Sequence, residues 1–173
     1  MIKSIVPIKA FHDNYIWCLR NGENAVVVDP GDANPVFDYL NKEKLNLVGI
    51  LTTHHHPDHV GGNKTLLSKF QVPIYGPKKE KIPGITHRLE EGDQIFIKDI
   101  NQNFSIIDIP GHTLGHIGYY NDKLLFCGDT LFSCGCGRLF EGTPKQMYQS
   151  LAKIAGLPDE IMIFCGHEYT EAN

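Results

Sequence analysis

The segment that decides the fold is Thr53-His54-His55-His56-Pro57-Asp58-His59. It follows the apolar run Val48-Gly49-Ile50-Leu51, which predicts a buried strand. Residues two apart in an extended chain point to the same side, so His54 and His56 can converge on one metal ion. His55 then points away from that ion. Because histidine is the commonest metal ligand, the spacing predicts a metal site at the end of this strand.

The second half of the same segment offers ligands for another ion. Pro57 ends the extended geometry, and the change of direction lets Asp58 and His59 address a second point nearby. One short loop after a buried strand can therefore serve two ions, although two ions need more ligands than this loop contains.

Three further ligand candidates lie at the ends of other apolar runs. His112, Asp129 and His167 each follow such a run closely, and each stands next to a glycine that permits close backbone approach. Loops at strand ends, held by a rigid sheet, are where binding sites are usually built. A carboxylate at Asp129 could bridge two ions. We therefore expect these three side chains to complete a site for two metal ions.

The rest of the sequence predicts strands and helices in both halves of the chain. Asn21-Gly22 is a hairpin turn signal between the strand-like runs 15–19 and 25–28. Asn34 is expected to cap a helix, and Thr143-Pro144-Lys145-Gln146 predicts the start of another. Further strands are expected at 48–51, 94–97, 104–107, 117–120, 123–126 and 161–164. This pattern predicts sheets packed together with helices outside.

Composition and charge limit the classes of protein. The 173 residues fit one domain, and no apolar run approaches the length of a membrane span. A net charge of −4 argues against nucleic acid or an anionic membrane as partner. The N-terminus lacks the long apolar stretch of a signal peptide. We expect a monomeric, cytoplasmic protein that acts on a small molecule.

The remaining cysteines and histidines have structural interpretations. The five cysteines include one tight spacing, Cys134-Gly135-Cys136, and no framework of pairs, so reduced thiols are expected. His12, His87 and His116 match no ligand position. We expect them, together with His55, to lie at the surface or to make structural hydrogen bonds.

Taken together, the motifs resemble a known superfamily. T-H-x-H-x-D-H, P-G-H-T and G-D-T resemble the metallo-β-lactamase superfamily, which implies an α/β (α+β type) fold. That fold is an αββα sandwich of two mixed β-sheets with helices on the outer faces. Val28-Asp29-Pro30-Gly31-Asp32 resembles the superfamily's early acidic motif, which implies that Asp29 supports the metal site from behind the ligands.

Other segments are similar to glyoxalase II, the hydroxyacylglutathione hydrolases. They are Asp13–Trp17, Gly128–Ser133, Gly135–Thr143 and Gly166–Thr170. The resemblance implies seven ligands: His54, His56 and His112 on one ion, Asp58, His59 and His167 on the other, and Asp129 between them. It also implies two divalent ions, with zinc expected and iron or manganese as alternatives. Asp58 would in addition orient the nucleophile as a catalytic residue.

The same resemblance implies a reaction and a substrate. A hydroxide held between the two ions would cleave the thioester of S-D-lactoylglutathione to D-lactate and glutathione, the second step of methylglyoxal detoxification. Arg138, Phe140 and Tyr169 would contact the glutathione moiety, and a guanidinium suits a peptide carboxylate. Family members often have tyrosine where Phe140 stands, so one hydroxyl contact is expected to be absent.

The end of the sequence differs from the family pattern. Members of the family continue beyond the Tyr169-Thr170 motif into a helical region that supplies basic residues for glutathione, whereas this sequence ends at Asn173. We therefore expect one metallo-β-lactamase-like domain, 1–173, without that helical domain. The expected consequence is weaker substrate binding, or hydrolysis of less specific thioesters.

Several alternatives stay open at this level. Persulfide dioxygenases share the scaffold and the stretch Gly135–Arg138 but use a single iron, so metal stoichiometry discriminates between the two activities. A general thioesterase, or a binding relative that has lost activity, would keep the same fold. A nuclease is disfavoured by the acidic balance, and a lactamase would leave the glutathione-type segments without a role.

Overall fold

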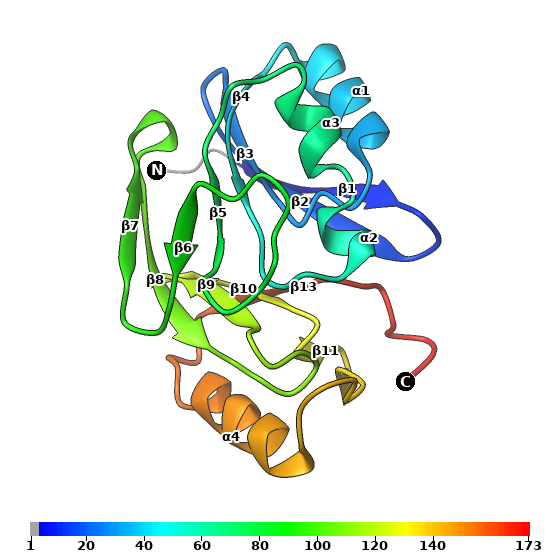
Figure 1. Ribbon diagram of the computed structural model, residues 1–173, viewed down its shortest axis with the longest axis vertical. Coiled ribbons are helices and arrows are strands. Elements are labelled where there is room, and N and C mark those ends of the chain that lie inside the picture. The colour runs from blue at the N-terminus through cyan, green and yellow to red at the C-terminus, as the bar shows by residue number, and fades with distance from the viewer. Residues whose placement is uncertain (1–3) are drawn as a thin grey trace.

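A computed structural model describes residues 4–173, and two β-sheets packed against each other form its centre (Figure 1). The first sheet has the strand order β1-β2-β3-β4-β5-β6. Its strands are β1 Ser4–Ala10, β2 Asn14–Asn21, β3 Asn24–Val28, β4 Asn46–Leu51, β5 Ile74–Pro77 and β6 His87–Leu89. β1, β2 and β3 pair antiparallel, whereas β3 to β6 pair parallel, so this sheet is mixed.

The second sheet has the order β13-β10-β9-β8-β7 and is also mixed, because β13 runs parallel to β10 while the other pairs are antiparallel. Its strands are β7 Gln94–Ile97, β8 Gln102–Asp108, β9 Ile117–Tyr120, β10 Leu124–Gly128 and β13 Met162–Cys165. A small hairpin is formed by β11 Leu131–Phe132 and β12 Gly135–Cys136, and a 3₁₀ turn, η1, covers Lys98–Ile100.

Helices cover the outer face of each sheet. α1 Ala33–Glu43 and α3 Asn63–Leu67 pack on the first sheet, with Val36, Leu40 and Leu66 buried against it. α4 Pro144–Ala155 packs on the second sheet through Ile154. The short α2 Pro57–Val60 lies next to the histidine-rich loop. Apolar side chains from both sheets, Phe104 and Phe126 among them, fill the space between the sheets. The predicted αββα sandwich is therefore confirmed.

The N-terminal cap of α1 differs from the prediction. The helix begins at Ala33, and Asp32, not Asn34, is its cap, because the Asp32 carboxylate accepts a hydrogen bond from the Asn34 backbone N–H at 2.9 Å. Pro35 still lies in the first turn, where its missing N–H costs nothing. The strands β1, β5 and β6 were not predicted at all. Across residues 4–173, no helix combines the length and the apolar character needed to cross a membrane.

The cap of α4 agrees with the prediction and gives a first test. Thr143 accepts a hydrogen bond from the Gln146 N–H, and the Gln146 side chain accepts one from the Thr143 N–H. Thr143→Ala is expected to lower the free energy of unfolding by about 1 kcal/mol, because it leaves a helix donor unpaired. Urea denaturation measures this, with Thr65→Ala on the exposed side of α3 as the matched control. Equal stability of the two variants would contradict the capping role.

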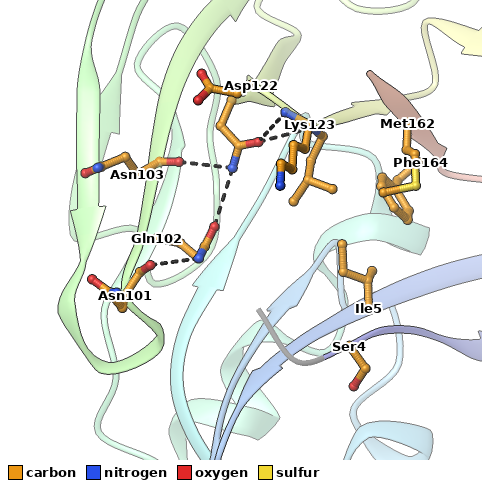
Figure 2. A pocket seen from close by; sticks show the side chains of 11 residues that line it. Ser4, Ile5, Asn101, Gln102, Asn103, Asp122, Lys123, Met162 and Phe164 are labelled. Carbon is orange, nitrogen blue, oxygen red and sulfur yellow. Dashed lines mark hydrogen bonds between the residues drawn. The ribbon is translucent and has the colours of Figure 1, made fainter. Parts of the chain in front are cut away.

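A cavity of about 690 Å³ opens where β1, β10 and β13 begin (Figure 2). The polar groups on its wall pair with one another: Asn121 donates to the Asn103 carbonyl at 3.3 Å and accepts from the Lys123 and Leu124 N–H groups. Met162 and Phe164 form its apolar side. Two of the candidate ligands, Asp129 and His167, follow the other ends of β10 and β13, so this cavity is remote from them.

Candidate metal centre

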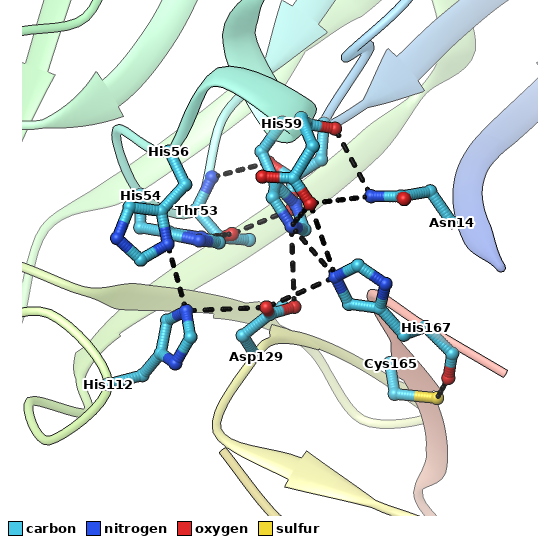
Figure 3. Close-up of polar contacts among 12 residues, drawn as sticks. Asn14, Thr53, His54, His56, His59, His112, Asp129, Cys165 and His167 are labelled. Carbon is cyan, nitrogen blue, oxygen red and sulfur yellow. Dashed lines mark hydrogen bonds and ion pairs between the residues drawn. The ribbon is translucent and has the colours of Figure 1, made fainter. Parts of the chain in front are cut away.

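The seven candidate ligands come from loops at one edge of the sandwich, each placed by the end of a strand or by α2 (Figure 3). The loop after β4 supplies two histidines, and α2 supplies an aspartate and a histidine. The loops after β8, β10 and β13 supply one side chain each. The residues are His54, His56, Asp58, His59, His112, Asp129 and His167.

The first group consists of His54, His56 and His112, whose potential ligand atoms all lie within 4.8 Å of one another. Nε2 of His112 is 2.9 Å from Nδ1 of His56 (Figure 3). His54 is fully buried and His56 is partly exposed at the pocket wall. Three converging imidazoles are a typical donor set for a divalent transition-metal ion.

The second group consists of Asp58, His59 and His167, and it meets the same 4.8 Å limit. Nε2 of His59 and Nε2 of His167 are 3.3 Å apart, and Oδ2 of Asp58 lies 3.4 Å from each of them. A carboxylate with two imidazoles is again a transition-metal donor set. The predicted change of direction at Pro57 therefore brings Asp58 and His59 to a second point beside the first.

Asp129 lies between the two groups. Its Oδ2 is 3.3 Å from Nε2 of His112 and 3.2 Å from Nε2 of His167, and its Oδ1 is 3.4 Å from Nε2 of His59 (Figure 3). One carboxylate thus faces both histidine groups, as a bridging ligand must.

Hydrogen bonds aim the histidines at this point. The Thr53 hydroxyl donates to Asp29 at 2.7 Å, so it accepts from Nδ1 of His54, 3.0 Å away. Nδ1 of His112 faces the Arg138 carbonyl at 2.8 Å. Both contacts require Nδ1–H, which leaves the Nε2 lone pairs directed into the site. Fixing the tautomer in this way is what residues behind metal ligands do in general.

Two buried atoms are left without partners and fit a metal ion. Among the described residues, Nε2 of His54 and Oδ1 of Asp129 are buried and make no hydrogen bond. A buried polar atom without a partner costs about 1–3 kcal/mol. A divalent cation would satisfy both atoms, and imidazole and carboxylate donors suit it. These residues therefore form a site for divalent metal.

The pKa values of the buried histidines also fit a site for a divalent cation. Burial lowers the pKa of His54 well below its ordinary value, so this histidine is neutral and free to act as a ligand. Burial also disfavours the charged form of His167, but the carboxylates of Asp129 and Asp58 outweigh it and raise the pKa of His167 to about 10. Since a ligand histidine must be neutral, binding of a cation here would release that proton.

Asp29, for which the family resemblance implies a supporting role, lies behind the candidate ligands, against Thr53 and beside His59. Its carboxylate accepts from the N–H and the hydroxyl of Thr53, both at 2.7 Å, and lies 3.2 Å from Nδ1 of His59. Its backbone has a φ of 53°, in the left-handed region. The residue thus connects the histidine loop to the end of β3 and orients His59.

Two supporting residues were missed by the ligand prediction. Asn14 donates from Nδ2 to Oδ2 of Asp58 at 2.9 Å, and Oδ1 of Asp13 lies 2.8 Å from Nδ1 of His167. Asp13 ends the turn between β1 and β2 and Asn14 begins β2, both far from the candidate ligands in sequence. Their only signal was the family-like segment Asp13–Trp17, which says nothing of what these side chains contact.

This contact gives a second prediction. Asn14→Ala is expected to weaken divalent-metal binding by about tenfold, because Asp58 loses the donor that orients it. Chelator competition on the zinc-loaded protein measures the change. Asn24→Ala, at the exposed hydrogen bond to the Asp99 carbonyl, is the control. Identical zinc affinities for all three proteins would refute the role of Asn14.

The other histidines have structural positions, as predicted. His116 is fully buried, accepts the Asp129 N–H at 3.1 Å and stacks on His54. Burial lowers its pKa to about 3, so it remains a neutral acceptor. His12 and His87 are exposed. His55 turns away from the ligands toward Glu80 and Glu141. All five cysteines are free.

Gly166 is required by close packing. A Cβ at this position would lie 2.3 Å from Oδ1 of Asp129 and 2.8 Å from Cε1 of His59, so any side chain would displace a candidate ligand. The glycine beside His167 therefore lets the end of β13 approach the ligands, as the sequence suggested.

A pocket of about 530 Å³ opens over the ligands, and the three residues predicted to contact substrate line it. Phe140 is exposed and places its ring edge-on to His56 and His112, with centroids 5.4 and 5.2 Å apart. Tyr169 stacks on His167 at 4.9 Å. The Arg138 guanidinium carbon lies 5.3 Å from the centre of the Phe140 ring. The pocket thus has aromatic and cationic walls above a floor of candidate ligands.

Comparison with known proteins agrees with this geometry. The family model of the metallo-β-lactamase superfamily matches residues 11–167. A hydroxyacylglutathione hydrolase from Vibrio parahaemolyticus is 55% identical over 98% of this chain and 67% of its own. Across eight such curated relatives, the chain spans 65% to 68% of their length.

Solved structures share the fold. A B3 metallo-β-lactamase, BLEG-1, superposes with a TM-score of 0.84 at 27% identity, over 95% of this chain and 91% of that one. TTHA1623 in a di-iron-bound form superposes with a TM-score of 0.77 at 27% identity, over 98% and 97%. The chain therefore belongs to the metallo-β-lactamase superfamily and, within it, to the hydroxyacylglutathione hydrolase (glyoxalase II) family.

Proposed function

We propose that this protein hydrolyses the thioester of S-D-lactoylglutathione to D-lactate and glutathione, using two divalent metal ions. The observation that carries the proposal is the position of Asp129, whose carboxylate faces both histidine groups at the floor of the pocket. Relatives named hydroxyacylglutathione hydrolase support the substrate. The first ion would be held by His54, His56 and His112, the second by Asp58, His59 and His167, with Asp129 shared.

Ions held here would supply Lewis acidity and a hydroxide nucleophile at neutral pH. The side chains of the protein hold and orient the reacting groups. Asp58 is 41% exposed at its side chain and lies at the pocket floor, where its free oxygen can accept a hydrogen bond from the nucleophile. His59 and His167 hold the other Asp58 oxygen, and Asn14 donates to it. We assign Asp58 as ligand and as the residue that orients attack.

Because the leaving group is a thiolate, the proposed hydrolysis needs no general acid in addition to the residues named above. A thiol has a pKa of about 8.5, so a glutathione thiolate departs from the tetrahedral intermediate without a proton donor. Two further acidic groups behind the candidate ligands, Asp13 and Asp29, are engaged by His167 and Thr53. The scheme therefore needs ligands, one orienting carboxylate and a substrate pocket.

Arg138 provides a test of substrate binding. Its exposed guanidinium stands at the pocket wall and can pair with a carboxylate of the glutathione moiety. Arg138→Ala is expected to raise KM about tenfold with kcat nearly unchanged, because an interaction equal in ground and transition states is lost. Arg88→Ala on the exposed part of β6 is the control. A lower kcat at unchanged KM would contradict the assignment.

The identity of the metal, the cellular compartment and the domain organisation are part of the same proposal. Zinc is the proposed metal, since the donors are imidazoles and carboxylates; iron and manganese are alternatives. The free cysteines support a reducing compartment, the cytoplasm. Residues 1–173 are proposed to act as a single metallo-β-lactamase-like domain, since one apolar layer joins both sheets, and a monomer is proposed as well.

The experiment that tests the proposal compares substrates on metal-loaded protein. Hydrolysis of S-D-lactoylglutathione, followed by loss of thioester absorbance, is expected together with two ions per chain. One bound iron with oxygen uptake on glutathione persulfide would instead indicate a persulfide dioxygenase. Hydrolysis of simple thioesters at equal efficiency would reduce the proposal to a general thioesterase.

A further inference from the structure

His55 lies between two candidate ligands but turns away from the metal pocket and is not among its lining residues. Each of its ring nitrogens faces a carboxylate. Nδ1 is 3.0 Å from Oε2 of Glu80, and Nε2 is 3.3 Å from Oε1 of Glu141. The imidazole therefore bridges two acidic side chains that come from different loops.

Glu80 is the buried end of this bridge. It follows β5, and its side chain is only 4% exposed. Oε1 accepts hydrogen bonds from the Thr113 hydroxyl and from the Gly115 N–H, which lie just after His112. Oε2 makes no hydrogen bond within residues 4–173, and the His55 ring nitrogen 3.0 Å away is the group that faces it. A buried carboxylate is costly without compensation, and the His55 ring is the polar group that faces its second oxygen while the first oxygen holds the loop after His112.

Glu141 is the outer end and belongs to the loop that carries Arg138 and Phe140. Its Oε2 accepts the Leu114 N–H at 2.9 Å. This loop is also attached to the loop of His112 through the Arg138 and Gly111 carbonyls. The loop of His54 and His56 is joined to these two loops through His55, whose ring faces Glu141 directly and faces Glu80, the acceptor for the loop after His112.

We propose that His55 is a positioning residue, which through Glu80 and Glu141 fixes the ligand His56 relative to His112 and to the substrate wall of Arg138 and Phe140. The proposal rests on the proposed thioester hydrolysis for its kinetic part only. The Glu80 contact controls the metal ligands, and the Glu141 contact controls the substrate wall. His55 itself touches neither metal nor substrate.

His55→Ala removes both contacts and is expected to weaken zinc binding and to raise KM, each by about tenfold. Two conservative variants separate the contacts, because an asparagine amide can present an N–H to Glu80 at the position of Nδ1 and a glutamine amide can present one to Glu141 at the position of Nε2. His55→Asn is expected to restore zinc affinity and the visible spectrum of the cobalt-substituted protein. His55→Gln is expected to restore KM. His87→Ala, an exposed histidine on β6, is the matched control.

The measurements distinguish this proposal from the proposed function. If wild-type protein binds metal but does not hydrolyse S-D-lactoylglutathione, the proposed function fails, while chelator competition on His55→Ala and His55→Asn still decides the role of His55. Zinc affinity and cobalt spectra equal to wild type in His55→Ala would overturn the proposal. So would a uniform loss of thermal stability that neither conservative variant reverses.

Discussion

Asp129→Ala is expected to lose bound metal and thioesterase activity together, with kcat/KM falling on the order of 10³-fold or more. The reason is the position of this carboxylate: it lies within 3.4 Å of a histidine from each group, so its removal would affect both of the proposed ions. The buried histidines would then face each other with no anion between them. Metal content by elemental analysis and turnover of S-D-lactoylglutathione measure the two losses.

The matched control is Asp122→Ala, which removes an exposed aspartate from the turn before β10, beside the remote cavity. This variant is expected to keep both metal ions and full turnover. The decisive observation is whether Asp129→Ala loses bound metal and turnover together. An Asp129→Ala protein that is depleted of metal yet still turns over the substrate would show that the seven-residue site is not the catalytic centre.

Asp29→Ala is expected to have the second-largest effect, on folding and on metal binding at once. The substitution leaves the buried N–H and hydroxyl of Thr53 without their acceptor and frees His59. Buried donors without partners cost about 3 kcal/mol of unfolding free energy in such a case. Loss of the group behind a ligand histidine typically weakens metal binding by on the order of 10- to 100-fold.

Asp29→Asn separates the contributions of shape and charge. Asparagine tolerates the left-handed backbone at this position and keeps one carbonyl oxygen for the Thr53 N–H. Its amide cannot accept from His59. The asparagine variant is thus expected to regain much of the stability but little of the zinc affinity, as measured by urea denaturation and chelator competition. Full zinc affinity in Asp29→Ala would exclude a supporting role.

Local sequence patterns predicted much of this fold. Alternating and continuous apolar runs located strands such as Ala25–Val28, and the capping residues located α4, because both signals act over a few neighbouring residues. The strands β5 and β6 were not predicted, because they are short and their pairing depends on distant partners. Asp32 was not predicted as the cap of α1, because Asn34 offers an equally good local capping signal two residues later.

The residues of the candidate site also fall into two classes, those that local sequence predicts and those that it does not. Its ligands could be proposed from sequence because each follows a strand next to a glycine or belongs to one dense segment. Asp13, Asn14 and Glu80 could not, since each acts on a side chain between 33 and 154 positions away, which only the packing of the loops brings near. Their contacts depend on the assembled edge of the sandwich, and no local pattern encodes them.

The most direct test of the central claim is turnover of S-D-lactoylglutathione by protein that carries zero, one or two equivalents of zinc. If two ions share Asp129, metal-free protein should be inactive, and turnover should reach its full value only when two ions are bound per chain. Full turnover in metal-free protein, or none in protein holding two zinc ions, would contradict dinuclear thioester hydrolysis.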